Sequence, residues 1–493
     1  MSTFVFDENI FKSKFVKGNK LSNTAKNRES SNCDSICPAG SDNANMFKDY
    51  TASELLADTL HNVYGSAVPN KKNINLSSEI KDKMLEEIDC HGDDNLKSVF
   101  SELVDSLYFD SPNSSHASSA SLLKYLPESK QSDFGKLIFD VLFDDNTIKK
   151  LKNVIQEESN PLDDIVSCAY SHLNYMQKIP EGKKYARVFE GDLKALFEVM
   201  NSDFRAAIEN SSNSMSELEF LIAYYLFIYL SQFALRIDND LEDSPLDEKQ
   251  VFPFFKGAKE GVSEDRECIV NGWRRIEKKT QKLFKHMIVL NMLNCHTNEY
   301  PYLIYSDLYK LYKEHPDERK QMDDALDFLI FQYTVEFEYD TDEDGQKVDF
   351  TNVQRNESDD SVINFKNKVK YLFDCVSYQL DSKSSRSSVV TNVAKNYNHI
   401  LKMRFVKSWG SMGLMMMFTN EDLINLISIC ERTSPLVVQD RGIQISDLFS
   451  EFQNRGLYMD GKTKQFVIDY LLEINLIDSK CDSEEAQYVK FIQ

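Results

Sequence analysis

An apolar stretch from Phe220 to Leu235, unbroken as far as Leu230, constrains the fold more than any other feature of the sequence. It is about 16 residues long and has two polar residues near its end, so it is shorter than the ~20 apolar residues of a membrane-spanning helix. Ser214 and Glu217, just before it, have the spacing of a capping box, which predicts a helix start. A helix that is apolar on all sides is normally buried inside a large protein. We therefore expect a core helix and no membrane contact.

The chain has 493 residues, whereas single hydrophobic cores rarely grow beyond ~250–300 residues, so two or three domains are expected. Hydrophobic residues make up 42% of the sequence, which excludes a chain that is disordered throughout. Its 16 Gly and 11 Pro are few for a Rossmann or barrel enzyme, which spends more residues on loops. The composition therefore predicts a mostly α fold.

The charge balance limits how the protein can meet nucleic acid. The sequence has 57 Lys and Arg against 79 Asp and Glu, a net charge of −22. A protein that grips duplex DNA over its whole surface needs the opposite sign, because it must neutralise phosphates. Any contact with DNA is therefore local or passes through a partner. The nine cysteines form no regular framework and the first residues lack a signal-peptide pattern, so we expect reduced thiols and a cytoplasmic protein.

The sequence divides into four predicted regions, which are a basic, partly disordered arm at 1–48, a helical main region at 49–381, a linker with a connecting helix at 382–414, and a winged-helix-like module at 415–493. Aromatic residues between Phe4 and Phe15 give the arm a segment able to dock on a neighbour. Apolar periodicity in the main region predicts helices near residues 133–156, 162–177, 190–209, 264–293, 302–314 and 362–380. A small β-hairpin is predicted where Thr334–Tyr339 alternates before the turn pair Asp344-Gly345.

The C-terminal module has the clearest order of predicted elements. A helix begins near Thr419, and a strand at Ile443–Ile445, two further helices and two final strands follow. Helix, strand, helix, helix, hairpin is the order of a winged helix. From residue 420 to 493 there are thirteen acids and seven Lys or Arg, a net charge of −6, which disfavours DNA contact. The third helix is expected to turn these residues away from the core: Lys464, Gln465, Ile468 and Leu472. Ile468 and Leu472, four residues apart, would form an exposed apolar strip that suits protein docking.

No common catalytic signature is present. The sequence has no G-x-x-x-x-G-K-[ST] loop, no H-E-x-x-H and no G-x-S-x-G, so we predict neither enzymatic activity nor a cofactor. One alternative is a metal-dependent nuclease whose carboxylates converge only in the fold. Its candidates are the acids on either side of Pro245, namely Asp238, Asp240, Asp243 and Asp247.

Four residues would suffice for a zinc site. Cys33 and Cys37 have a permitted spacing for a first ligand pair, and Cys90 with His91 would complete the set. Against this, Cys90 and His91 are adjacent in the sequence. The alternative, which we prefer, is free thiols in a linker.

The strongest basic cluster falls within twelve residues and consists of Arg274, Arg275, Lys278, Lys279, Lys282 and Lys285. At helical spacing, several of them would line one face of the helix expected at 264–293. In a chain this acidic, we favour a solvated face that pairs with acidic neighbours. The alternative is contact with phosphate or with an acidic partner, which would make the chain a direct DNA-binding subunit.

The C-terminal sequence resembles the DptG family of the phosphorothioation-dependent DNA restriction system. The resemblance covers about 90 residues and rests on Leu457–Asp460, Ile468–Ile477, Asp482-Ser483 and Ala486–Val489. The family hairpin is similar to S-D-S-G-D-A-Q-Y-V, and this chain departs from it at Cys481, Glu484 and Glu485.

This resemblance implies a cytoplasmic bacterial protein that works with two companions, DptF and DptH, to restrict DNA lacking the sulfur modification. In that family the nucleotide-hydrolysing motifs are expected in the companions, and no catalytic residue carries over to this chain. The function expected is therefore a non-catalytic subunit that bridges ATPase or nuclease partners, with DNA met through the complex.

Overall fold

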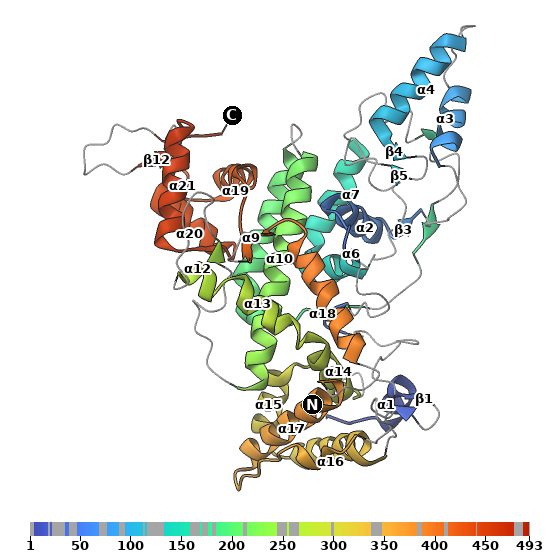
Figure 1. Ribbon diagram of the computed structural model, residues 1–493, viewed down its shortest axis with the longest axis vertical. Coiled ribbons are helices and arrows are strands. Elements are labelled where there is room, and N and C mark those ends of the chain that lie inside the picture. Colours follow the sequence, from blue (N-terminus) through green and yellow to red (C-terminus); the bar gives the residue numbers. More distant parts are fainter. Residues whose placement is uncertain are drawn as a thin grey trace.

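The computed structural model describes residues 4–17, 20–21, 35–38, 47–68, 76–87, 94–111, 114–115, 133–157, 168–169, 176–179, 184–210, 214–243, 254–255, 266–296, 300–336, 348–381, 387–408, 413–439, 441–477 and 487–492. Helices dominate it, as the composition predicts, and the strands are short (Figure 1). The main helices are α1 (Glu8–Phe15), α2 (Ala52–Tyr64), α3 (Leu76–Glu87), α4 (Asp94–Tyr108), α6 (Asp133–Leu137), η1 (Ile138–Leu142), α7 (Asp145–Glu157), α9 (Glu190–Glu209), α10 (Ser214–Leu241), α12 (Glu267–Val270), α13 (Trp273–Thr280), α14 (Leu283–Leu293), α15 (Tyr305–Glu314), α16 (Arg319–Phe331), η2 (Gln332–Glu336), η3 (Phe350–Asn352), α17 (Ser361–Asp381), α18 (Ser387–Lys402), α19 (Asn420–Thr433), α20 (Ile445–Asn454) and α21 (Gly461–Glu473).

The strands form two-stranded pairs. They are β1 (Val16–Lys17) with β2 (Lys20–Leu21), β3 (Ser66–Ala67) with β6 (Gln177–Lys178), β4 (Phe109–Ser111) with β5 (Ser114–Ser115), β7 (Phe254–Phe255) with β11 (Tyr458–Met459), β8 (Val406–Ser408) with β9 (Leu414–Met416), and β10 (Ile443–Gln444) with β12 (Tyr488–Val489). The β7–β11 pair is parallel and the others are antiparallel.

Helix α10 is the axis of the molecule. It packs against α2, α9, α13, α15 and α18 and runs through the centre of the view in Figure 1. Within the described part of the chain it is the one helix long and apolar enough to cross a membrane, yet 94% of that apolar window is buried inside the protein. The prediction of a core helix is therefore confirmed.

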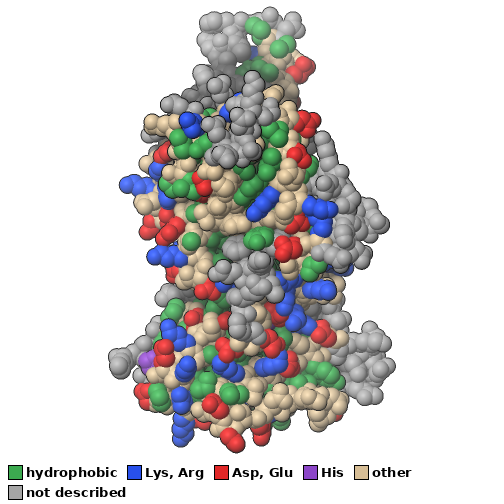
Figure 2. Space-filling view, turned by 90° about the vertical axis from the view of Figure 1, so that its left-hand side faces the viewer, with side chains coloured by type: hydrophobic (Ala, Val, Ile, Leu, Met, Phe, Trp, Pro, Cys, Tyr) green, Lys and Arg blue, Asp and Glu red, His purple; other side chains and the backbone are tan. Residues whose placement is uncertain are grey.

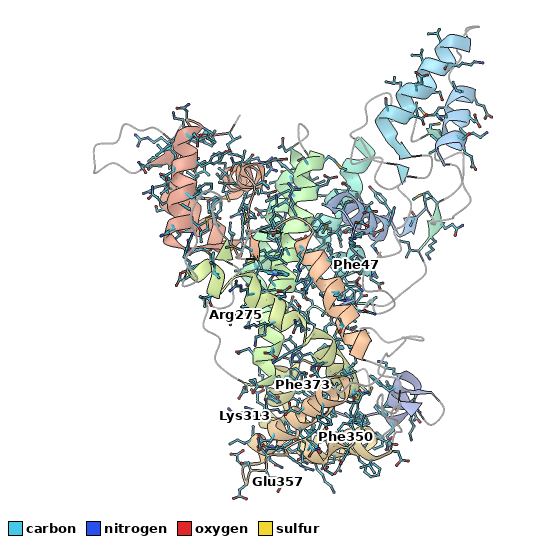
Figure 3. All side chains as sticks on the ribbon, viewed as in Figure 1. Phe47, Arg275, Lys313, Phe350, Glu357 and Phe373 are labelled. Atoms are coloured by element: carbon cyan, nitrogen blue, oxygen red, sulfur yellow. The ribbon has the colours of Figure 1, made fainter. Side chains whose placement is uncertain are left out.

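A single hydrophobic cluster connects all four predicted regions. It includes Phe4 and Phe47 of the arm, Phe373 of the main region, Tyr397 of the predicted connecting helix and Val489 of the C-terminal module. Figure 3 labels Phe47 near the middle of the molecule and Phe373 in its lower part. The connecting helix, α18, packs against α10, α13 and α14. The described residues of the four regions thus share one core.

The aromatic residues of the arm dock on the lower half of the body. Phe11 is buried, and its ring meets that of Phe328 in α16 edge to face at 5.7 Å. The Phe4 N–H donates to Glu318 Oε2 at 3.0 Å, and the Asp7 N–H donates to the Cys295 carbonyl at 2.8 Å. Asp7 also caps α1, since its side chain accepts from the first turn.

The helix expected at 264–293 is broken into α12, α13 and α14, so that prediction is wrong in its continuity. The first break occurs at Gly272, where a Cβ atom would lie 2.0 Å from the Cys268 carbonyl oxygen. Only glycine permits this close approach of two backbone segments. The second break is the turn at Gln281 and Lys282. The helices predicted at 190–209, 302–314 and 362–380 are present as α9, α15 and α17.

The predicted hairpin strand at 334–339 begins in a helix instead. Thr334 and Glu336 belong to η2, a π-helical turn that continues α16. The reason is tertiary, because this turn buries Tyr333, whose hydroxyl donates to Gln379 Oε1 at 3.0 Å. The predicted turn at Asp344-Gly345 lies outside the described residues.

The C-terminal module contains α19, β10, α20, α21 and β12 in the predicted order, with β11, which was not predicted, between α20 and α21. Ile443 pairs with Val489, which also bridges to Ile477, so three segments meet at Val489. Helix α19 begins with a capping box between Thr419 and Asp422. The winged-helix assignment itself stays a prediction, because residues 478–486 lie outside the described chain.

Candidate partner-docking site and its buried support

Helix α21 carries the four residues predicted to dock a partner, and the structure leaves less of them free than expected. Lys464 lies over the Phe449 ring, with Nζ 5.4 Å from its centroid. The side chains of Ile468 and Leu472 are half-buried and pack against the hydrophobic cluster. The prediction of an exposed apolar strip is therefore wrong for this pair, because the strip faces the body of its own module.

The outward face of α21 is polar. Gln465 is exposed, and its Nε2 donates to Asp469 Oδ1, one turn later, at 2.9 Å. Beyond the helix, Ile474 and Phe491 are exposed apolar side chains. A partner that docks on this face would meet an amide and a carboxylate, with isolated apolar groups at the end of the helix.

The start of α21 is fixed to α12 by a two-point ion pair. Arg266 Nη2 lies 2.6 Å from Asp460 Oδ1, and its Nε lies 3.0 Å from Oδ2. Asp460 also caps α21 by accepting the Thr463 N–H at 2.8 Å. Partial burial alone would raise the pKa of Asp460, but the hydrogen bonds from Arg266 and Thr463 lower it to about 2. The carboxylate thus stays charged and holds both elements.

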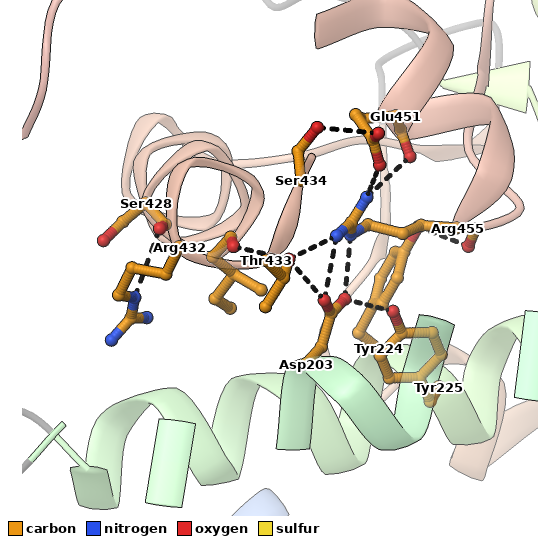
Figure 4. A network of polar contacts seen from close by, with 10 residues as sticks. Asp203, Tyr224, Tyr225, Ser428, Arg432, Thr433, Ser434, Glu451 and Arg455 are labelled. Carbon is orange, nitrogen blue, oxygen red and sulfur yellow. Dashed lines mark hydrogen bonds and ion pairs between the residues drawn. The ribbon is translucent and has the colours of Figure 1, made fainter. Parts of the chain in front are cut away.

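A buried ion network joins the module to the main body (Figure 4). Arg455, which follows α20, is 1% exposed, and Asp203 of α9 is 0% exposed. The guanidinium group binds both Asp203 carboxylate oxygens and donates to the Thr433 hydroxyl of α19 at 2.7 Å. Three helices from two predicted regions therefore meet at one arginine.

Neighbouring groups complete this network, and one of them is Glu451 of α20, whose Oε2 accepts from Arg455 Nη1 at 2.5 Å. Tyr225 of α10 donates its hydroxyl proton to Asp203, and Tyr224 donates to the Arg455 carbonyl at 2.9 Å. Burial alone would lower the pKa of Arg455, but Asp203 raises it well above its usual range, so the guanidinium stays charged. A second link, Arg432 Nη2 to Glu217 Oε2 at 2.7 Å, ties α19 to α10.

Sequence reasoning missed Arg455 and Asp203. Neither belongs to a motif, and 252 residues separate them. The one local signal was an arginine directly before Gly456.

The basic cluster at 274–285 does not form one face. Lys279 and Lys282 both pair with Asp238 of α10, and Lys285 is buried with its Nζ 2.6 Å from Asp381. Since the helix breaks at 281–282, the single-face geometry expected for these residues is wrong. Arg274 and Lys278 are exposed, and Arg275, half-buried, is labelled at the edge of the molecule in Figure 3.

His286 links Asp238 to Tyr305 in the interior. Its Nε2 lies 3.3 Å from Asp238 Oδ1, and its Nδ1 lies 3.1 Å from the Tyr305 hydroxyl. Burial lowers the pKa of His286, so the imidazole is neutral near pH 7. Burial alone would raise the pKa of Asp238, but hydrogen bonds from His286, Lys279 and Lys282 bring it far below its ordinary value. This chain of groups stabilises the C-terminal end of α10, where the helix dipole disfavours acids.

The acids proposed for a metal-dependent nuclease have separate partners. Asp240 accepts the Ser306 N–H at 2.9 Å, and partial burial raises its pKa to about 6. Asp243 pairs with Lys366, and Asp247 lies outside the described residues. Within the described ranges, no three His, Cys, Asp or Glu side chains are placed to hold a metal ion.

Of the four zinc candidates, only Cys37 lies within the described residues, and Cys33, Cys90 and His91 lie outside them. Cys37 is buried, with Sγ 3.3 Å from the Met287 sulfur. Burial raises its pKa to about 12. Zinc binds the thiolate form, so this environment favours the free-thiol alternative.

Comparison with known proteins adds no relative to this picture. No family model matches the chain, and no curated protein matches it. The residues that carry the DptG resemblance are partly described, with Leu457–Asp460 spanning β11 and the α21 cap, and Gln487–Val489 containing β12.

Proposed function

We propose that the chain is a non-catalytic subunit of a phosphorothioation-dependent DNA restriction complex, a cytoplasmic phage-defence system, and that it bridges companions similar to DptF and DptH. The observation that carries the proposal is the Arg455–Asp203 pair, which joins the module that resembles the family to the helical body. A module held in this way presents its outer face at a fixed orientation, which is what a bridging subunit needs.

The use of the charged residues supports the same proposal. Lys279, Lys282 and Lys285, for which contact with phosphate or an acidic partner was the alternative prediction, contact Asp238 and Asp381 of this chain. On the face seen in Figure 2, acidic and basic side chains are interspersed, above all over the lower part. Such a surface suits protein contacts better than the single-sign field that steers DNA.

Direct DNA binding is the second candidate, and the exposed cations Arg274 and Lys278 favour it locally. It predicts that binding to a duplex falls steeply with salt and weakens further in Lys278→Glu. A metal-dependent nuclease is the third, and it would need carboxylates beyond the described residues.

The proposal is tested by expressing the full chain together with its companion proteins and purifying the assembly. Gln465→Arg with Asp469→Arg changes the outward face of α21, and Gln321→Arg with Asp324→Arg makes the same two changes at exposed positions of α16. We expect the α21 pair to reduce co-purification at least tenfold and the control pair to leave it intact. If the lone chain hydrolyses ATP, or cleaves DNA with Mg²⁺, the proposal fails.

A further inference from the structure

The outer face of α4 carries an apolar stripe that water reaches freely. Leu96 is 57% exposed, Val99 61% and Leu103 45%, and these three are among the most exposed large apolar side chains of the described chain. Their spacing of three and then four residues places them on one side of the helix. Single exposed apolar side chains are ordinary, but three in one stripe mark a contact surface.

The other apolar face of the α3–α4 hairpin is buried. Ile80 and Met84 of α3 and Val104 of α4 are fully buried. Lys81 of α3 also reaches across to Asp105 of α4, with Nζ 2.7 Å from Oδ2. The two helices therefore fix each other, and the stripe is what remains after this packing.

The hairpin projects away from the body. Figure 1 shows α3 and α4 at the upper end of the molecule, and Figure 2 shows hydrophobic side chains exposed near the same end. Among the described helices and strands, α4 packs mainly against α3 and against β4, which follows it directly in the chain. The described helices of the body therefore leave the stripe open to a partner.

Charge decides what kind of partner fits. Helices α3 and α4 contain seven acidic residues against three lysines, a net of −4. Two of the lysines are already paired, Lys81 with Asp105 and Lys83 with Glu86, and Glu102 lies exposed beside the stripe. A second copy of the chain would bring the same negative charge to the contact and would be repelled. A helix with Lys or Arg beside its apolar residues would be attracted.

We propose that this stripe docks an amphipathic helix with basic flanks, supplied by a partner protein, which lies along α4 as the third helix of a small bundle. The inference deepens the proposed bridging function and rests on it for the identity of the partner. The stripe from Leu96 to Leu103 is about 10 Å long, so two to three turns of the partner helix would cover it. Heptad spacing on both helices gives the packing geometry.

The test measures binding of a fluorescent synthetic peptide to the full chain. The peptide has 21 residues, Leu at positions a and d of each heptad and Lys at the flanking positions, and a second peptide has Glu in place of Lys. Leu96→Ser/Val99→Ser/Leu103→Ser removes the stripe. Val270→Ser/Ile363→Ser is the matched control, because these side chains are 58% and 50% exposed on other helices.

We expect the Lys peptide to bind the wild-type chain and the control, and the stripe variant to bind at least tenfold more weakly. Circular dichroism should show the same melting curve for all three, since none of the changed side chains is buried. The inference is overturned if the stripe variant binds the Lys peptide as tightly as the wild type, or if the Glu peptide binds equally well. It is also overturned if the wild-type chain is a dimer in light scattering and the stripe variant is a monomer, because a second copy then occupies the stripe.

Co-purification with the companion proteins shows whether a negative result contradicts the docking surface or the proposed function. If the wild-type chain fails to assemble with its companions but binds the peptide through the stripe, the proposed function fails and the docking surface stands. If assembly succeeds and the stripe variant still binds the peptide, the surface is wrong and the function stands.

Discussion

The guanidinium group of Arg455 holds both carboxylate oxygens of Asp203, with Nε 2.8 Å from Oδ2 and Nη2 2.9 Å from Oδ1. Both side chains are withdrawn from water, so each is the other's main compensation for lost hydration. Removing one member of the pair is therefore expected to lower the free energy of unfolding more than removing all the charges of the network.

Asp203→Asn leaves the buried guanidinium with one carboxylate, Glu451, in place of two. We expect a loss of about 3–5 kcal/mol in the free energy of unfolding, measured by urea denaturation. Asp203→Leu combined with Arg455→Met and Glu451→Gln removes all three charges and should cost less than Asp203→Asn alone. If the triple variant is no more stable than Asp203→Asn, the ion network is not the source of the effect.

Gly456 has a φ of 79°, and a Cβ atom there would lie 2.7 Å from Ile228 Cγ2 of α10. Gly456→Ala adds backbone strain and a steric clash, so we expect it to destabilise the fold by about 2–4 kcal/mol. Gly65→Ala is the control, because Gly65 has a φ of 68° but nothing within 4 Å of a built Cβ. Equal losses in the two variants would show that α20 and α10 are less closely packed than described.

Asp240 gives the fold a pH dependence of known sign. Partial burial raises its pKa to about 6, above the ~3.9 of an unfolded chain, so the folded state binds more protons between these values. Its contribution to stability is present below about pH 4 and is lost as the pH rises through 6. Asp240→Asn keeps an acceptor for the Ser306 N–H and should be more stable, relative to the wild type, at pH 8 than at pH 5. Urea denaturation at the two pH values measures this, and an identical difference at both would contradict it.

The thiol of Cys37 should be unreactive in the folded protein. Burial raises its pKa to about 12, whereas Cys168 is exposed. Treatment with iodoacetamide at pH 8, followed by mass spectrometry, should label Cys168 at least a hundredfold faster than Cys37. Bound zinc would also protect Cys37 from iodoacetamide, so the zinc content of the same sample is measured by elemental analysis. One zinc ion per chain would support the site formed by Cys33, Cys37, Cys90 and His91.

Sequence periodicity predicted those helices whose buried residues recur regularly along the helix itself. Helices α9 and α17 lie within a residue or so of their predicted bounds, because their apolar residues recur every three or four positions over about five turns. The central helix α10 was predicted for a related reason, since its apolar run has no polar face to expose. The existence and bounds of these helices depend little on residues far away in the sequence.

What the sequence did not predict depends on distant contacts. Gly272 breaks a helix because of the Cys268 carbonyl beside it, and Ile468 is half-buried because of how α21 sits on its module. Asp203 and Arg455 carry no pattern that marks them as partners across 252 residues. Long-range pairing of this kind becomes visible only when the elements are assembled.

The docked aromatic arm has a consequence for how the protein is made. Phe4 binds Glu318, 314 residues further along the chain. At roughly 5–20 residues per second, a ribosome needs roughly 15 to 65 s to add the residues in between. During that time Phe4, Phe11 and Phe15 of the nascent chain have no binding surface of their own to cover them. This segment, which is synthesised well before the surface that buries it, is thus among the last to find its place, and a chaperone that shields short aromatic stretches would protect it until then.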